Sequence, residues 1–150
     1  MLLKILVRVF VFLILMAAIG MTAISVAMAG PTVKQERLIN KYAKKYNLDP
    51  KLLTAIAEVE SKFNSHAVGD LGELGLFQLR PEFHPTVKEG DDRSNIEAAA
   101  KYLAYVKDRC EPTYGDAWFV CFNHGQNKRL LAPKVSTYYK RVITLYRSND

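Results

Sequence analysis

Metal-binding motifs are missing from this 150-residue sequence, which has only three histidines and two cysteines. His66, His84 and His124 stand alone, without the His-x-x-x-His or Cys-x-x-Cys spacing that gathers ligands around one ion. The absence of these motifs argues against a metal-binding site. We therefore expect no metal and no cofactor, and we expect the histidines at surface or helix-capping positions.

Signatures of three other function classes are also missing. No Gly-Lys-Ser/Thr follows the glycine-bearing segment, which excludes a typical phosphate loop, and no Gly-x-Ser-x-Gly elbow supports a serine nucleophile. The lysines and arginines are scattered along the sequence, without the arginine run or basic helix that marks nucleic-acid binding. We expect no nucleic-acid partner.

Charge is absent from residues 9–29, an apolar run of 21 residues that follows Lys4 and Arg8. Small residues at Ala27 and Ala29 form an A-x-A pattern, as before a signal cleavage site. The run is nevertheless longer than a usual signal core and close to the roughly 20 residues that span a bilayer. Residues 1–29 are thus predicted to be either a signal peptide or a retained membrane anchor, and both place residues 30–150 outside the cytoplasm. The expected location is the periplasm, free or anchored to the inner membrane, or the virion if the source is a virus.

Removal of residues 1–29 takes away two positive charges and no negative ones, so the net charge falls from +6 to +4. A mildly basic surface is compatible with binding to an anionic cell-wall polymer or to a lipid surface.

Residues 30–150 contain no repeat and no linker, which predicts one compact domain. Thr32 with Gln35, and Ser94 with Glu97, have the spacing of capping boxes at helix starts. The segment 67–85 is rich in glycine and proline and suggests turns with one or two short strands. We predict a mainly α domain with a small loop or β-hairpin insert, preceded by the hydrophobic N-terminal helix. Besides the helix that follows Asp49, helices are expected within residues 32–47, 94–110, 115–125 and 136–146.

The stretch "AEVESKF" contains two glutamates whose helical positions differ by about 200°. Its helix should begin after Asp49, which can cap the first amides, with Pro50 at the first helical position. Glu58 falls on a solvated face. Glu60 lies on the apolar stripe of Leu53, Ile56 and Ala57, where burial should raise its carboxyl pKa and allow it to act as a general acid. The alternative is a buried glutamate paired with a lysine or arginine.

The two cysteines, Cys110 and Cys121, can form a disulfide in an exported protein. Sequence alone leaves open the alternative that Cys121 is a small buried residue.

Four stretches, "ESKFN", "GELGLFQLRP", "NIEAAAKYL" and "CFNHG", together with "YYKRVI" near the end, resemble one family in their order and spacing. This family is the lytic transglycosylases of the soluble murein transglycosylase type (SLT domain), relatives of goose-type lysozyme. The similarity covers most of residues 36–146 and implies a lysozyme-like fold that acts on the glycan strands of peptidoglycan.

The resemblance implies that Glu60 is the single catalytic carboxylate. It would protonate the bond between N-acetylmuramic acid and N-acetylglucosamine and leave a 1,6-anhydromuramoyl end. Ser61 would orient Glu60, while Gln78 and Asn123 would bind substrate near the cleaved bond. Tyr138 would enter the site from the last helix, with the adjacent Tyr139 as its rival.

Each of these residues also has a structural interpretation. Gln78 can bond the loop backbone, Asn123 can end a helix before Gly125, and Ser61 can lie on a helix surface. Three aromatic residues are expected in the core and not as sugar platforms, namely Tyr102, Trp118 and Phe119.

The sequence departs from the family pattern at Phe77, where methionine is frequent, and at Phe122, which replaces a tyrosine. Asp70 and Glu73 add carboxylates near Glu60, and either can hold a water for an inverting hydrolase, so a hydrolytic muramidase is an alternative. Another is a non-catalytic wall-binding component of a secretion, conjugation or phage-entry assembly.

Overall fold

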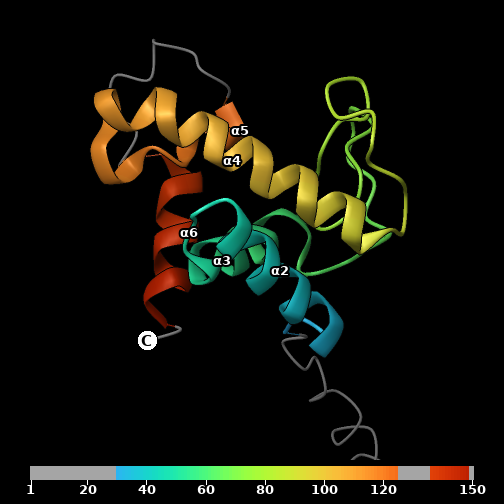
Figure 1. The fold of residues 1–150 in the computed structure, drawn as a ribbon. Helices are drawn as coiled ribbons and strands as arrows, with labels where there is room; N and C mark the ends of the chain where they lie inside the picture. The colour runs from blue at the N-terminus through green and yellow to red at the C-terminus, as the bar shows by residue number, and fades with distance from the viewer. Residues whose placement is uncertain (1–29, 125–135, 149–150) are drawn as a thin grey trace, which may run out of the picture.

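The computed structural model describes residues 30–124 and 136–148, and this part of the chain is mainly helical. The predicted N-terminal hydrophobic helix and the predicted signal or anchor lie outside the described residues. Within them, no helix is long and apolar enough to cross a membrane. Figure 1 shows the long α4 crossing over α2 and α3, with α6 beside α3. The elements in chain order are α2 (Val33–Lys45), α3 (Pro50–Ser61), α4 (Asp92–Tyr114), the 3-10 turn η1 (Gly115–Ala117), α5 (Val120–His124) and α6 (Thr137–Ser148).

The starts of α2 and α3 confirm the two caps predicted from the sequence. Thr32 and Gln35 form a reciprocal capping box, in which Gln35 N donates to Thr32 Oγ1 at 3.2 Å. The Asp49 carboxylate accepts from Lys51 N at 2.8 Å, and Pro50 occupies the first position of α3.

The predicted start of α4 is wrong by three residues. Asp91 and not Ser94 is the N-cap, because its carboxylate accepts from Arg93 N at 3.1 Å. Ser94 instead donates to Asp91 O, and Glu97 binds Lys45 at 2.7 Å. The apolar positions predicted for this helix are all buried, namely Ile96, Ala99, Ala100, Leu103, Val106 and Cys110.

The predicted helix over residues 115–125 is interrupted. Gly115 leaves the helical conformation with φ 55°, a 3-10 turn follows, and α5 occupies only Val120–His124. The predicted burial is confirmed, because Ala117 to Phe122 are all buried. The predicted Gly125 cap lies outside the described residues. A disulfide joins Cys110 near the end of α4 to Cys121 on α5, so it ties the short helix to the long one.

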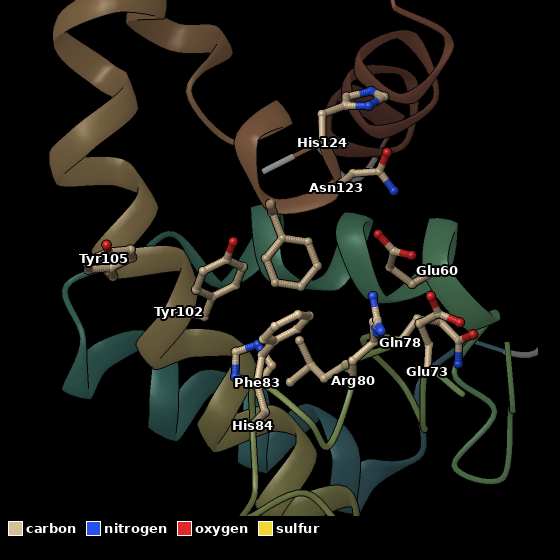
Figure 2. Close-up of a pocket in the computed structure, with 12 residues that line it drawn as sticks. Glu60, Glu73, Gln78, Arg80, Phe83, His84, Tyr102, Tyr105, Asn123 and His124 are labelled. Atoms are coloured by element: carbon tan, nitrogen blue, oxygen red, sulfur yellow. The ribbon is translucent and has the colours of Figure 1, made fainter. Parts of the chain in front are cut away.

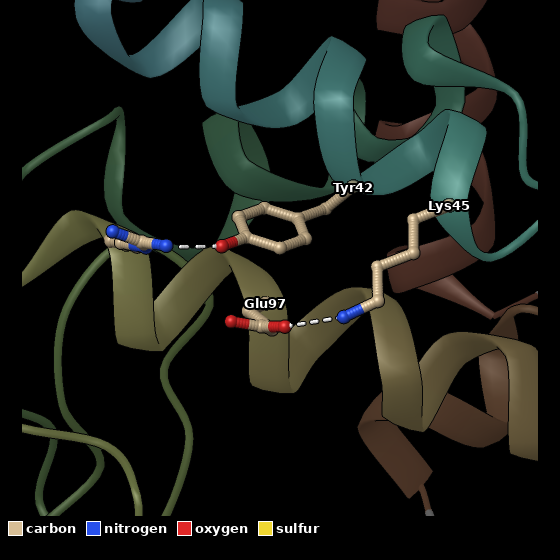
Figure 3. Close-up of polar contacts among 4 residues, drawn as sticks. Tyr42, Lys45 and Glu97 are labelled. Atoms are coloured by element: carbon tan, nitrogen blue, oxygen red, sulfur yellow. Dashed lines mark hydrogen bonds and ion pairs between the residues drawn. The ribbon is translucent and has the colours of Figure 1, made fainter.

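Helix α2 is fastened to α4 by polar contacts at the edge of the core (Figure 3). Arg93 Nε donates to the Tyr42 hydroxyl at 3.3 Å, and Lys45 Nζ lies 2.7 Å from Glu97 Oε1. On the other side α3 packs against α6, and Arg141 of α6 donates to Val59 O at 3.2 Å. Helix α3 therefore lies between α2 and α6 and packs against both.

The segment between α3 and α4 contains two isolated bridges, Val68 with Leu74 and Leu74 with Leu79, where the sequence predicted short strands. Its shape comes from the buried Asn95 of α4, which accepts from Phe77 N at 2.8 Å and donates to Leu74 O at 2.7 Å. A side chain at Gly75, with φ 69°, would collide with the Asn95 amide. The Asn95 side chain thus bonds backbone groups of the loop that a neighbouring strand would bond in a β-sheet.

We predict that Asn95→Ala lowers the free energy of unfolding by about 2–3 kcal/mol, because it leaves backbone groups of Phe77 and Leu74 without partners. Urea unfolding followed by circular dichroism measures the loss. Asn40→Ala, at an exposed amide on α2, is the matched control and should change stability by less than about 0.5 kcal/mol. Equal effects of the two substitutions would contradict the role given to Asn95.

Candidate active site

A cleft with a volume of about 790 Å³ lies where the end of α3, the following loop, α4 and α5 converge (Figure 2). Its volume is in the range of sites that hold small ligands. Polar groups gather at one end around Glu60, and aromatic groups gather at the other around Tyr105. The lining residues are Glu60, Glu73, Gln78, Leu79, Arg80, Phe83, His84, Tyr102, Tyr105, Phe122, Asn123 and His124.

Glu60 is directed into this cleft by the apolar stripe of α3. Leu53, Ile56 and Ala57 are fully buried on the same helix face, as predicted. The Glu60 Oε1 atom is shielded from solvent and has no hydrogen-bond partner. Burial raises the pKa of Glu60 from its ordinary 4.5 to about 7, so about half of the molecules carry a proton on this carboxyl group at neutral pH.

Three neighbours adjust this pKa. After burial, the Tyr138 hydroxyl has the largest influence and lowers the pKa, Arg141 lowers it by its positive charge, and Glu73 raises it by its negative charge. The Tyr138 hydroxyl lies close to the Glu60 carboxyl group, yet neither this hydroxyl nor Glu60 Oε1 forms a hydrogen bond. Tyr138 is therefore a close polar neighbour without a formed bond. Among the described residues Glu60 forms no ion pair, which argues against the structural alternative of a paired, buried glutamate.

Ser61 lies beside Glu60 in sequence but does not line the cleft. Its hydroxyl donates to Leu76 O at 2.9 Å and lies 3.5 Å from Ala57 O. The Ser61 hydroxyl therefore links the end of α3 to the following loop. It forms no hydrogen bond with the Glu60 carboxyl group.

Gln78 and Glu73 bring the loop to the polar end of the cleft (Figure 2). The Gln78 amide donates to Gly75 O at 2.9 Å and to Ala67 O at 3.3 Å, so it braces the loop as well as facing the cavity. Glu73 Oε2 accepts from Leu71 N at 2.9 Å. Asp70, the other carboxylate considered from sequence, is exposed and does not line the cleft.

The opposite wall comes from α5, which brings the exposed Asn123 and His124 to the cavity. The two tyrosines of α6 separate in the structure. Tyr138 is buried next to Glu60, whereas Tyr139 stacks on Phe119 at 5.5 Å between ring centroids. Tyr138 is thus the tyrosine that reaches the site.

The aromatic end of the cleft was missed by the sequence analysis. Tyr102 was expected in the core, but it is only half-buried and lines the cavity between Phe122 and His84. His84 also departs from the expected surface position, and burial lowers its pKa. The i, i+3 spacing of Tyr102 and Tyr105 on one face of α4 was the available signal. Trp118 and Phe119 are buried as predicted, and Phe77 packs edge-on against Phe122.

The arrangement suits acid–base chemistry by a single carboxyl group. An acid with a pKa of about 7 lies at one end of an open groove, where the neutral side chains of Gln78 and Asn123 and the charged side chain of Glu73 also line the wall. No group of three or more histidine, cysteine, aspartate or glutamate side chains within residues 30–124 and 136–148 is placed to hold a metal ion.

Comparison with known proteins gives a family match and several relatives. The family described as "Transglycosylase SLT domain" matches residues 37–134. The chain is 51% identical over 133 residues to the membrane-bound lytic murein transglycosylase E of Buchnera aphidicola subsp. Baizongia pistaciae. This match covers 75% of the chain and 61% of the relative.

Two further relatives are similar over shorter regions. The membrane-bound lytic murein transglycosylase C of Actinobacillus pleuropneumoniae serotype 5b is 35% identical over 85 residues, covering 47% of this chain and 23% of the relative. The transglycosylase of Enterobacteria phage PRD1 is 29% identical over 103 residues, a match that covers 65% of this chain and 37% of the relative. The chain therefore spans less than two thirds of the length of each of these curated relatives.

We predict that the pKa of Glu60 moves in opposite directions when its two charged neighbours are neutralised. Glu73→Gln removes a negative charge and should lower it, whereas Arg141→Gln removes a positive charge and should raise it, each by a few tenths to about one pH unit. Carbon-detected NMR titration of the glutamate carboxyl groups measures both. Shifts in the same direction would contradict the assigned surroundings of Glu60.

Proposed function

Because this chain belongs to the transglycosylase SLT family, we propose that it is a lytic transglycosylase that cuts the glycan strands of peptidoglycan. The observation that carries the proposal is the position of Glu60, which lines an open cleft with Oε1 shielded from solvent and has its pKa raised by burial. A general acid works best when its pKa lies near the working pH, and the value of about 7 meets this condition.

The reaction begins with proton transfer from Glu60 to the glycosidic oxygen between N-acetylmuramic acid and N-acetylglucosamine. The bond from C1 of the muramoyl residue to this oxygen breaks, and N-acetylglucosamine leaves with a new hydroxyl group. The C6 hydroxyl of the same muramoyl residue attacks C1, and its proton passes to the Glu60 carboxylate. The product carries a 1,6-anhydro ring, no water is consumed, and Glu60 regains its proton.

One carboxyl group suffices for this reaction because the nucleophile belongs to the substrate. Glycosidases that use water or an enzyme nucleophile need a second carboxylate to activate or supply it. An intramolecular hydroxyl group already lies close to the reacting carbon, so its attack carries a small entropic cost. The near-neutral pKa of Glu60 favours the switch from acid to base within one turnover.

The neighbours of Glu60 support particular roles in this reaction. The Tyr138 hydroxyl, which faces Glu60, would donate a hydrogen bond when the carboxyl group becomes charged. Asn123 on α5 and Gln78 on the loop would bind substrate polar groups on opposite walls of the cleft. Ser61 would position Glu60 indirectly, by holding the loop against the end of α3.

A hydrolytic muramidase is the second candidate, favoured by one observation. Glu73 lines the same cleft and its charge acts on Glu60. In inverting glycosidases a second carboxylate of the active site activates a water molecule for attack on the sugar. The reaction products separate the two candidates.

The setting proposed for this reaction is the outer side of a bacterial inner membrane, in the periplasm. The sequence of residues 9–29 supports an exported or anchored chain, and two of the relatives carry the description membrane-bound. The phage relative is compatible with local opening of the wall for a larger assembly, such as a secretion, conjugation or phage-entry machine.

We predict that Glu60→Gln abolishes clearing of peptidoglycan sacculi in a gel zymogram, with a loss of at least about 100-fold. Glu58→Gln is the matched control, because the same change two residues earlier lies outside the cleft and should leave activity within about twofold. Equal clearing by the Glu60→Gln variant and wild type would remove the catalytic role of this residue.

Mass spectrometry of the released fragments extends the same experiment. Wild type should release 1,6-anhydromuramoyl ends, and Glu73→Gln should release the same product at a comparable rate. Reducing ends from wild type, together with inactivity of the Glu73→Gln variant, would favour the hydrolase.

A further inference from the structure

Five basic residues that look scattered in the sequence gather on one face of α2. Positions 34, 37, 41, 44 and 45 fall within an arc of about 100° around the helix axis. The buried residues Ile39 and Ala43 point to the opposite side, toward the core. The acidic residue of α2, Glu36, lies outside the arc. The outer face of α2 is therefore positively charged along the length of the helix.

One member of this set differs from the other four. Lys45 is paired with Glu97 of α4 and belongs to the contact that holds the two helices together (Figure 3). The remaining four side chains are exposed, and no carboxylate within residues 30–124 and 136–148 forms an ion pair with them. We call these four the basic stripe; it consists of Lys34, Arg37, Lys41 and Lys44.

The position of the basic stripe in the chain points to a lipid partner. The uncharged, apolar run of residues 9–29 ends four positions before the start of α2. Val33, the first residue of α2, leaves 64% of its surface exposed beside the stripe. A helix with an exposed apolar residue at its start and a row of cations on its outer face suits an interface of acyl chains and phosphate groups.

We propose that the basic stripe docks on the surface of a membrane that contains anionic phospholipids. Each lysine or arginine held near such a surface strengthens binding by about 1 kcal/mol, which corresponds to roughly fivefold. The four cations together supply a strong preference for anionic over neutral lipid. This interaction falls with rising salt, because the lipid field is screened within a Debye length.

Docking through α2 leaves the cleft accessible. None of the residues that line the cleft belongs to α2, and the catalytic candidate Glu60 lies on α3. The stripe would therefore set the orientation of the domain at the membrane while the groove stays open to glycan. This inference does not depend on the proposed reaction.

The test uses the full chain reconstituted in vesicles, either pure phosphatidylcholine or a mixture with phosphatidylglycerol. The two native cysteines are joined to each other, so one introduced cysteine gives a single labelling site. A fluorophore at Asn40→Cys reports on α2, and a second one at Thr113→Cys reports on the far end of α4. Quencher groups on the lipid headgroups measure how close each label lies to the surface.

We expect quenching at position 40 to be several-fold stronger in the anionic vesicles than in the neutral ones, and to weaken when salt is added. Quenching at position 113 should be low in both. The triple variant Lys34→Gln, Arg37→Gln and Lys41→Gln should lose the anionic effect. A control with the same change of charge at exposed sites elsewhere should keep it; its substitutions are Lys88→Gln, Lys140→Gln and Arg147→Gln.

Equal quenching at position 40 in both kinds of vesicle, or equal behaviour of the two triple variants, would overturn the proposal. Loss of binding to sacculi by the stripe variant, with vesicle quenching unchanged, would also overturn it and would indicate an anionic wall polymer as the partner. Both triple variants should clear sacculi in detergent as wild type does. Failure of wild type to clear sacculi would affect the proposed function and not the membrane docking.

Discussion

The site depends on the desolvation of one carboxyl group. Glu60 continues the apolar stripe of α3, so the packing that fixes the helix also removes the carboxyl group from water. Its pKa of about 7 follows mainly from this burial, and the charges of Arg141 and Glu73 oppose one another. The packing of the fold therefore sets the pKa of this acid. A protonated group is available at neutral pH without a dedicated partner to hold the proton.

The remaining parts of the structure keep this group at the edge of a cleft. Asn95 holds the loop by two backbone groups, and Ser61 ties the same loop to the end of α3. From the other side, α6 packs on α3 and brings Tyr138 next to Glu60. The disulfide joins α5 to α4 two residues before Asn123. Three segments far apart in sequence thus meet around one carboxyl group.

Local patterns were sufficient to predict the main helices and the direction of Glu60, because helical periodicity and caps act within a few residues. Contacts between distant segments were not predictable in this way. The capping signal at Ser94 failed because Asp91 offers an equivalent cap one turn earlier. The choice between Tyr138 and Tyr139 required the packing of α6 on α3, and the place of Tyr102 in the cleft required the path of the loop beside α4. The buried amide of Asn95 had no signal in hydrophobic periodicity.

The pH dependence of folding stability tests the protonation of Glu60 most directly. A glutamate whose pKa rises from 4.5 to about 7 on folding binds its proton more tightly in the native state, so its contribution to stability is lost as the pH rises above 4.5 and levels off above 7. Glu60→Gln removes this loss. Between pH 4 and pH 9 the free energy of unfolding of the variant, measured by chemical denaturation, should rise relative to that of wild type by up to about 3 kcal/mol. A stability difference that stays constant over this range would contradict the account.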